Sequence, residues 1–319
     1  MKILANDGMS PSGIEALTKA GHEVITTKVA QEQVANFINQ NNISALVVRS
    51  ATKVRQEIID SCPGLRIIGR GGVGMDNIDV EYAKSKGIHV INTPAASSES
   101  VAELVFAHLF TGVRFLHESN REMPLEGDTQ FEKLKKAYAN GVELRGKTLG
   151  IIGMGRIGNA VARIGLGLGM KVIAAGRSEK TCPVRMDFYN GQSIEVNITT
   201  QPLNEVLRVA HFLSLHVPAQ DGYLIGQAEF EMMKDGVGIV NCARGGVVDE
   251  VALIEALESG KVSFAGLDVF ENEPNPAIQV LMHPSISLSP HIGAATLEAQ
   301  DRIGTELASQ INELAQNLS

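Results

Sequence analysis

Short apolar runs alternate with segments of helical periodicity from the first residues of the chain. Near-continuous apolar strands separated by helices are typical of a parallel sheet covered on both faces. In the first hundred residues this pattern predicts strands at Lys2–Asn6, Glu23–Thr27, Ala45–Arg49, Arg66–Gly69 and His89–Asn92. The predicted helices lie between them, at Pro11–Ala20, Gln31–Gln40, Val54–Ser61 and Val80–Lys86. The pattern therefore indicates the α/β fold class.

The same alternation of apolar strands and helical segments resumes after a polar middle region. Further strands are predicted at Lys171–Ala175, Phe212–Val217, Val237–Asn241, Phe264–Val269 and Ile286–His291. The helices predicted between them are Asn159–Leu168, Leu203–Ala210, Gln227–Lys234 and Glu250–Ser259. The alternation of strands and helices is interrupted at Pro183–Thr200. There the turn residues Tyr189-Asn190-Gly191-Gln192 lie between two stretches of alternating residues, which predicts an inserted hairpin.

Three connecting segments define the expected domains. Glu99–His117 is predicted as one long helix, Met123–Arg145 as polar and irregular chain, and Ala295–Leu318 as a final helix that returns to the N-terminal domain. A length of 319 residues suits two domains. We expect one domain at residues 1–96 plus 287–319, and a second domain at residues 97–286.

The apolar run Leu149–Ile152 ends in a Gly-x-Gly-x-x-Gly motif made by Gly153, Gly155 and Gly158. The first glycine permits a tight turn, the second lets a pyrophosphate approach the backbone, and the third lets the following helix pack closely. A helix N-terminus offers free N–H groups to phosphate. Because the motif lies between a predicted strand and a predicted helix, it favours dinucleotide binding over a purely structural turn.

A second glycine-rich loop, Arg70–Asn77, also contains Gly-x-Gly, at Gly72 and Gly74 around Val73. Asn77 stands where a third glycine would fall, so this loop is a weaker candidate for the dinucleotide. A backbone cradle for a small anion and a plain turn remain equally open interpretations.

Composition narrows the classes of partner. The formal net charge is −8, aromatic residues make up 4% and tryptophan is absent, so the chain lacks the basic surface of a nucleic-acid-binding protein. The apolar segment Val101–Leu116 is interrupted by charged residues, which argues against a membrane span. Three cysteines without paired or metal-like spacing indicate a reducing compartment and no metal site. We expect a cytoplasmic protein.

Three polar residues follow predicted strands in the half that holds the glycine motif: Arg244, Glu273 and His291. A guanidinium can bind a substrate carboxylate through two hydrogen bonds, and an imidazole can exchange the hydroxyl proton. A carboxylate beside the imidazole would orient the ring. This is the set that oxidation of a 2-hydroxy acid requires. Each residue has a structural alternative, however, and the neighbouring Glu271 could take the place of Glu273.

The chain resembles the D-isomer-specific 2-hydroxyacid dehydrogenases over nearly its whole length. The resemblance rests on blocks that occur in the family's order, namely Val48–Val54, Gly71–Asp79, Gly153–Gly158, Asn241–Glu250, Gly266–Phe270 and Pro290–Gly293. It implies two Rossmann-like or flavodoxin-like domains, of which residues 1–96 plus 287–319 form the substrate-binding (catalytic) domain and residues 97–286 the NAD(P)-binding Rossmann domain. It assigns carboxylate binding to Arg244, acid/base chemistry to His291 and the partner carboxylate to Glu273, which it selects over Glu271 by its place in Asp-Val-Phe-x-x-Glu-Pro.

The resemblance also implies the binding residues. Substrate contacts are expected from Arg49 and the Gly72-Val73-Gly74 backbone. If the substrate is phosphorylated, Arg49 together with Lys53 is expected to hold the phosphate. The expected cofactor contacts, beyond the three motif glycines, are Arg156, Ile157, Gly176, Arg177, Val217, Cys242, Ala243, Asp268, Gly293 and Ala294.

One departure from the family pattern concerns the cofactor. NAD-binding members place an acidic residue about twenty residues after the glycines, to bind the ribose 2′-hydroxyl. Here that place holds Gly176, followed by Arg177. NAD(H) is the family default, and NADP(H) remains open because Arg177 could attract a 2′-phosphate.

Within the family the chain is most similar to members that oxidise 3-phosphoglycerate to 3-phosphohydroxypyruvate at the entry to serine synthesis. Longer members carry a regulatory domain after the last helix, so allosteric control by serine is not expected. The alternatives are an NADPH-preferring glyoxylate/hydroxypyruvate reductase and, in another class, a dinucleotide-sensing interaction protein of the corepressor type. The family also implies a homodimer or a dimer of dimers.

Overall fold

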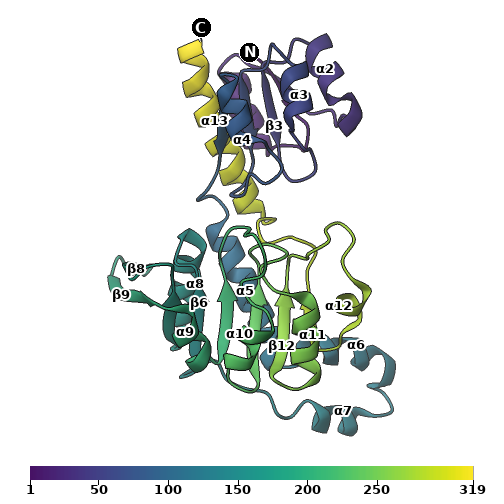
Figure 1. Cartoon of the computed structure of the whole chain (residues 1–319), viewed down its shortest axis with the longest axis vertical. Coiled ribbons are helices and arrows are strands. Elements are labelled where there is room, and N and C mark those ends of the chain that lie inside the picture. Colours follow the sequence, from purple (N-terminus) through teal and green to yellow (C-terminus); the bar gives the residue numbers. More distant parts are fainter. Residues whose placement is uncertain (319) are drawn as a thin grey trace. The chain divides into compact units, whose positions relative to one another are not determined.

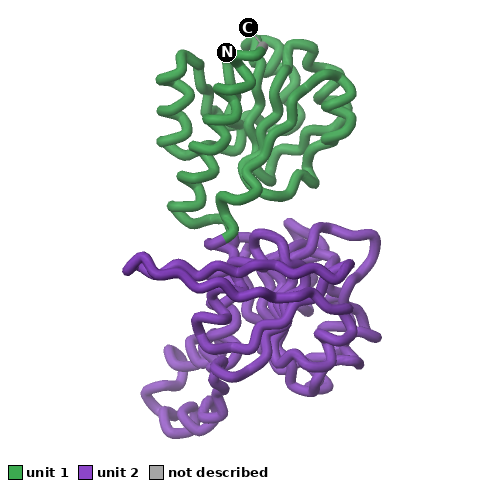
Figure 2. Tube along the Cα trace, turned by 90° about the vertical axis from the view of Figure 1, so that its left-hand side faces the viewer, with its two compact units in different colours: residues 1–98, 294–319 green, residues 99–293 purple. Residues whose placement is uncertain are grey.

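The computed structural model describes residues 1–318 and divides the chain into two compact units (Figures 1 and 2). Unit 1 consists of residues 1–98 and 294–319, and unit 2 of residues 99–293. The second crossing therefore lies at residues 293 and 294, not at 286 and 287 as expected. The reason is that the strand Ile286–Leu288 pairs with Ala265–Leu267 and so belongs to the sheet of unit 2.

Unit 1 is a five-stranded parallel sheet with the order β2-β1-β3-β4-β5, which is the strand order of flavodoxin-like folds. Its strands are β1 (Lys2–Ala5), β2 (Glu23–Ile25), β3 (Ala45–Val48), β4 (Ile67–Arg70) and β5 (His89–Asn92). Its helices are α1 (Pro11–Lys19), the 3-10 turn η1 (Gln31–Gln33), α2 (Val34–Gln40), α3 (Gln56–Ser61), α4 (Val80–Ser85) and α13 (Leu297–Leu318).

The last helix returns to the N-terminal unit, as expected from the sequence. Ile303, Leu307 and Ile311 of α13 are buried together with Leu17 of α1 and Ile3 of β1. Helices α2, α3 and α4 cover the opposite face of the sheet through a second apolar cluster. Both faces of the sheet are therefore buried, which explains why its strands are apolar without alternation.

Unit 2 is built on an eight-stranded sheet with the order β13-β12-β11-β10-β6-β7-β9-β8. The strands are β6 (Thr148–Ile152), β7 (Lys171–Ala175), β8 (Thr181–Asp187), β9 (Ser193–Gln201), β10 (Phe212–Leu215), β11 (Val237–Asn241), β12 (Val262–Leu267) and β13 (Ile286–Leu288). The helices are α5 (Ser98–Val113), α6 (Leu116–Glu126), α7 (Phe131–Ala137), α8 (Arg156–Gly167), α9 (Leu203–Val209), α10 (Gln227–Met232), α11 (Glu250–Glu258) and α12 (Ile278–Met282).

This sheet is doubly wound. Helices α9 to α12 bury side chains on one face, and α5 and α8 bury side chains on the other. All strand pairs are parallel except β8 with β9, which form the inserted antiparallel hairpin predicted for Pro183–Thr200, at the sheet edge (Figure 1). The order reverses between β6 and β10, so a crevice for a ligand is expected outside the carboxyl ends of these two strands.

Two sequence predictions in unit 2 are wrong. Glu99–His117 is not one helix, because Phe115 adopts a left-handed conformation (φ +53°) between α5 and α6. Met123–Arg145 is not irregular, since it contains the end of α6 and all of α7. These helices show weak apolar periodicity: α6 contains Pro124, and Leu134 is the buried side chain of α7.

Candidate active site

The glycine motif forms the turn between β6 and α8 and meets the three steric demands of a dinucleotide loop. A Cβ on Gly153 would lie 2.5 Å from the carbonyl oxygen of His216, and a Cβ on Gly158 would lie 2.2 Å from that of Gly153. A Cβ on Gly155, by contrast, would meet nothing within 4 Å. The outer glycines are therefore required by packing, and the middle one leaves open space for a pyrophosphate.

Helix α8 begins at Arg156, and among the described side chains none caps its N-terminus. Gly155 and Arg156 are exposed there, while Ile157 is half-buried. Free N–H groups at the start of a twelve-residue helix suit a phosphate, and the exposed guanidinium of Arg156 adds a positive charge. The residues present thus fit the pyrophosphate of a nicotinamide dinucleotide.

His291 and Glu273 form the central pair of the site. The Nδ1 atom of His291 lies 2.8 Å from Oε2 of Glu273, and Oε1 of Glu273 accepts a hydrogen bond from the N–H of Phe270 at 3.0 Å. The side chain of His291 is 43% exposed. A carboxylate at Nδ1 assigns the exchangeable role to Nε2.

The hydrogen bonds of the structure distinguish Glu273 from Glu271, which residue spacing alone did not. Oε1 of Glu271 accepts from the N–H of Glu250 at 2.9 Å, and Oε1 of Glu250 accepts from the N–H of Glu271 at 2.9 Å. Oε2 of Glu271 also accepts from the hydroxyl of Tyr223. Burial raises the pKa of Glu250, with the nearby carboxylates of Glu271 and Glu273 adding to the effect. Glu271 therefore fastens a loop to α11.

Asp268 holds the loop that carries His291. Its side chain is buried, Oδ1 accepts from the hydroxyl of Ser289 at 2.6 Å and from the N–H of Ile292 at 2.8 Å, and Oδ2 accepts from the N–H of Gly293 at 2.8 Å. The pKa of the Cys242 thiol is raised well above its usual value by burial, and the charge of Asp268 adds to this. Cys242 therefore stays a neutral thiol beside this carboxylate.

Arg244 lies in the turn after β11. Its Nη1 donates to the carbonyl oxygen of Ala243 at 2.6 Å, and the buried side chain of Asn241 braces the turn through Ala243 N–H and Arg244 carbonyl oxygen. A Cβ on Gly245 would lie 1.8 Å from the carbonyl oxygen of Phe270. The turn that carries Arg244 thus packs directly against the loop that leads to Glu273.

The remaining predicted cofactor positions follow the carboxyl ends of other strands of unit 2. Val217 is half-buried after β10, and its Cγ1 would lie 3.2 Å from a Cβ on Gly153. Gly176 and Arg177 are exposed after β7. Thr200 ties this loop to β9, because its hydroxyl donates to Ser178 and accepts from the N–H of Lys180. Gly293 is buried and Ala294 is half-buried.

The predicted substrate-binding residues lie in unit 1, after β3 and β4. Asp7 fixes the first loop by accepting from the N–H groups of Arg49 and Thr52. Asn77 ties the second loop to the first through the carbonyl oxygens of Arg49 and Thr52. This role explains why Asn77 stands where a third glycine would fall.

Arg70 is a residue of this loop to which no role was assigned from the sequence. Gly72 adopts φ +137°, and a Cβ there would lie 1.8 Å from Nη1 of Arg70. A Cβ on Gly71 would lie 3.5 Å from Cγ of Arg49. Two guanidinium-bearing side chains therefore flank the Gly71–Gly72 backbone. The signal was present in the sequence, since Arg70 ends a strand and begins the glycine-rich loop.

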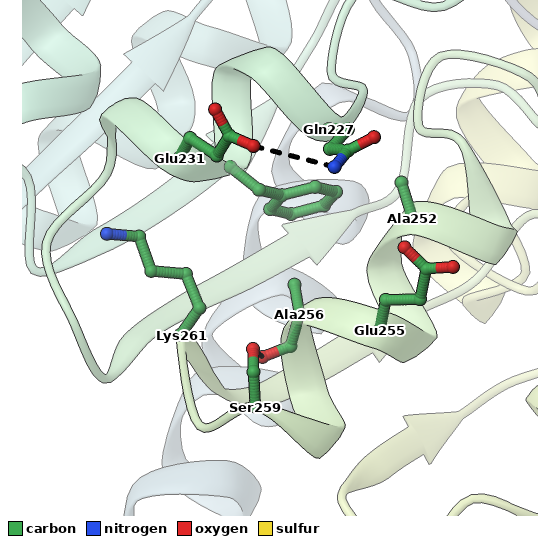
Figure 3. Close-up of a pocket in the computed structure, with 8 residues that line it drawn as sticks. Gln227, Glu231, Ala252, Glu255, Ala256, Ser259 and Lys261 are labelled. Atoms are coloured by element: carbon green, nitrogen blue, oxygen red, sulfur yellow. Dashed lines mark hydrogen bonds between the residues drawn. The ribbon is translucent and has the colours of Figure 1, made fainter.

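A surface hollow of about 400 Å³ lies elsewhere in unit 2, between α10 and α11 (Figure 3). Gln227, Glu231, Glu255 and Lys261 line it, and Lys261 precedes β12, so the hollow does not adjoin the carboxyl ends of the strands. Within residues 1–318, no group of His, Cys, Asp and Glu side chains is arranged to hold a metal ion. In the same part of the chain, every helix is too short or too polar to cross a membrane.

Comparison with known proteins identifies the family. Residues 106–293 match the family D-isomer specific 2-hydroxyacid dehydrogenase, NAD binding domain. The chain belongs to this family. The D-2-hydroxyacid dehydrogenase assignment agrees with the two-unit α/β architecture and with the glycine motif, and the match places an NAD-binding domain at residues 106–293.

Three relatives show the range of activities among similar proteins. The chain is 39% identical to a D-3-phosphoglycerate dehydrogenase of Methanocaldococcus jannaschii, over 100% of this chain and 59% of the relative. It is also 39% identical to a hydroxypyruvate reductase of Thermotoga maritima, over 97% of each chain. An NADPH-dependent glyoxylate/hydroxypyruvate reductase from Sinorhizobium meliloti, solved with NADP and malonate, has a TM-score of 0.79 at 27% identity, over 97% of this chain and 92% of that one. The chain thus spans about three fifths of the phosphoglycerate dehydrogenase and almost all of the hydroxypyruvate reductase.

Proposed function

We propose that this dehydrogenase interconverts 3-phosphoglycerate and 3-phosphohydroxypyruvate, the entry step of serine synthesis. The observation that carries this choice is the pair Arg49 and Arg70 beside Gly71–Gly72. A phosphorylated acid has a second anionic group besides its carboxylate. Guanidinium groups bind phosphate well because they offer several donors in one plane.

In the proposed mechanism each side chain has one task. Arg244 binds the substrate carboxylate, and its charge polarises the adjacent carbonyl group. Nε2 of His291 accepts the hydroxyl proton during oxidation and returns it during reduction, while Glu273 holds Nδ1 at 2.8 Å. The bound nicotinamide dinucleotide supplies or accepts the hydride. Asp268 keeps the His291 loop in place through the N–H groups of Ile292 and Gly293.

The substrate is tested by comparing kcat/KM for 3-phosphohydroxypyruvate, hydroxypyruvate and glyoxylate, each with NADH and NADPH. The proposal requires the phosphorylated acid to be preferred. It also requires that Arg70→Ala and Arg49→Ala raise KM for 3-phosphohydroxypyruvate by about 10- to 100-fold, while KM for hydroxypyruvate changes much less. Faster reduction of hydroxypyruvate than of its phosphorylated form would contradict the proposal.

A second candidate is an NADPH-preferring glyoxylate/hydroxypyruvate reductase. It is favoured by Gly176 and Arg177, which leave no carboxylate at the position expected to bind the ribose, and by the relative from Thermotoga maritima that matches almost end to end. A dinucleotide-sensing interaction protein of the corepressor type would bind NAD(H) without turning over any of these acids. The same assay therefore separates all three functions.

We also propose that the enzyme is a cytoplasmic homodimer or dimer of dimers. Among the described residues, five large apolar side chains are exposed on α5, α6 and α7, namely Phe110, Leu116, Met123, Leu125 and Phe131. Exposed apolar side chains concentrated on neighbouring helices are typical of a protein interface. Sedimentation of the wild-type protein and of Leu116→Glu tests this proposal. A monomeric wild-type protein would contradict it.

A further inference from the structure

A row of buried polar side chains lies beneath the loop that carries His291. His108 of α5 contacts two serines, with Nδ1 2.9 Å from the hydroxyl of Ser287 and Nε2 3.0 Å from that of Ser289. Ser289 in turn lies 2.6 Å from Oδ1 of Asp268. All four side chains belong to unit 2 and are between 1% and 8% exposed. No role was assigned to His108 from the sequence.

The donors in this row point in one direction. Ser289 has a single hydroxyl proton, which it donates to Asp268, so its oxygen must accept from Nε2–H of His108. Burial lowers the pKa of His108 and keeps the ring neutral, although the charge of Asp268 partly opposes this effect. Nδ1 therefore accepts from the hydroxyl of Ser287. The order is Ser287 to His108 to Ser289 to Asp268.

The helix comes close enough for these contacts because β12 carries a glycine at the crossing point. A Cβ on Gly266 would lie 2.6 Å from Cβ of His108. Ser287 and Ser289 are two residues apart, so both hydroxyls can face the same side of the chain. Helix packing and strand periodicity thus bring His108 to both serines.

Asp268 connects this row of hydrogen bonds to the backbone next to His291. It accepts from the N–H groups of Ile292 and Gly293, the two residues that follow His291. His291 adopts φ +53°, a conformation that residues other than glycine keep only where the surroundings hold it. Because the imidazole is 43% exposed, its direction depends largely on this backbone and on Glu273.

We propose that His108 is a positioning residue for His291, acting through Ser289 and Asp268. The proposal rests on the function proposed above, because it assigns His291 the proton transfer. In this proposal Nε2–H of His108 donates to Ser289, and Ser289 donates to Asp268. These two hydrogen bonds keep the Asp268 carboxylate directed at the His291 loop. A residue that only fills space or stabilises the fold would not need that donor.

Two substitutions of His108 separate these roles. His108→Gln keeps an amide N–H close to the place of Nε2, and His108→Leu keeps volume without a donor. In the full chain, His108→Leu should lower kcat by about 10- to 100-fold, the cost of a small misplacement of a reacting group. NADH affinity should change little, and the primary deuterium isotope effect on kcat should rise. His108→Gln should recover most of the lost kcat.

Ser289→Ala provides a second variant if His108→Leu folds poorly, because it removes the donor to Asp268 directly. The control is His211→Leu, which deletes another imidazole of unit 2 that accepts one hydrogen bond, from the N–H of Thr148 at the start of β6. This control should lower the melting temperature without changing kcat per folded molecule. Equal kcat for His108→Leu and wild type, or equal loss in the Gln and Leu variants, would overturn the proposal.

A spectroscopic measurement keeps this test separate from the test of function. The proton between Nδ1 of His291 and Glu273 can be followed by NMR in protein labelled at histidine nitrogen. His108→Leu should shift or broaden that resonance, and His108→Gln should preserve it. Absent turnover in the wild type would refute the proposed function, whereas an unchanged resonance in His108→Leu would refute the positioning role.

Discussion

Glu250 and Glu271 bind each other's backbone, since each carboxylate accepts the other residue's N–H at 2.9 Å. This reciprocal pair occupies Glu271 and leaves Glu273, two residues later, as the carboxylate that contacts His291. Residue spacing left the choice between these two neighbouring acids open and the family motif selected Glu273; the hydrogen bonds now distinguish the two residues independently.

Glu273→Gln and Glu271→Gln therefore form a matched pair of substitutions. Glu273→Gln removes the charge at Nδ1 of His291 and should lower kcat by about 100-fold, within the range of a lost acid/base contribution. Glu271→Gln should instead lower stability by about 1 kcal/mol with kcat nearly unchanged, because it weakens a structural hydrogen bond. Steady-state kinetics and thermal unfolding of both variants check this. The opposite ranking of the two kcat values would assign the catalytic role to Glu271.

Arg244→Lys tests the binding of the carboxylate. A lysine keeps the positive charge but replaces a planar, two-donor contact by a single ammonium group. We expect KM for the oxo acid to rise about 10- to 100-fold, while NADH affinity stays close to that of the wild type. KM and the NADH dissociation constant, measured on the same preparation, check the result. An unchanged KM would show that Arg244 does not bind the carboxylate.

Arg177→Asp tests the choice of dinucleotide. Arg177 is exposed after β7, and the residue before it is glycine. If Arg177 contacts a 2′-phosphate, the substitution should lower kcat/KM for NADPH by about 10- to 100-fold. The activity with NADH should stay the same or rise, since an acid can bind the ribose 2′-hydroxyl. A loss that is equal for both cofactors would remove Arg177 from the binding site.

Stability should fall in acid through His216. Its Nε2 lies 2.7 Å from the hydroxyl of Ser214, its buried Nδ1 has no partner within residues 1–318, and burial lowers its pKa from 6.5 to about 3. Between these values the unfolded chain binds a proton that the folded chain does not, so the free energy of unfolding decreases as pH falls through that window. This loss of stability is absent above pH 6.5. Inside the window, the free energy of unfolding falls by up to about 1.4 kcal/mol for each unit by which the pH falls.

Urea unfolding at several pH values checks this prediction, with His216→Gln as the comparison. The variant should show a shallower decline of stability below pH 6.5. His108 also has a pKa lowered by burial and contributes in the same direction, so some decline should remain. Parallel pH curves for variant and wild type would contradict a neutral His216 in the folded chain.

Much of this fold could be predicted because its strands are buried on both faces and therefore appear as apolar runs. The tail helix was also predictable, since Ile303, Leu307 and Ile311 recur at helical spacing. The helices α6 and α7 were not, because Pro124 interrupts one and the other buries Leu134. The boundary near residue 287 was misplaced because β13 has only three residues, and its membership of a sheet depends on pairing with β12.

The candidate site, like the fold, has residues that could be predicted from the sequence and contacts that could not. Arg244, Glu273 and His291 could be found because they stand in recognisable blocks after strands. The contacts that hold them could not be found, because they join residues far apart in sequence: His108 lies 181 positions from Ser289, and Asp268 lies 25 from Gly293. Arg70 was visible at a strand end, but its closeness to Gly72 depends on a backbone conformation that the sequence does not specify.

The most direct test of the account is a rapid-mixing measurement of NADH oxidation by 3-phosphohydroxypyruvate in wild type and His291→Ala, with NADH affinity determined on the same samples. The account predicts that the substitution slows the single-turnover rate by about 1000-fold or more, while the NADH dissociation constant stays nearly unchanged, because only proton transfer is lost. A variant that oxidises NADH at close to the wild-type rate would contradict the role of His291 and with it the proposed dehydrogenase chemistry.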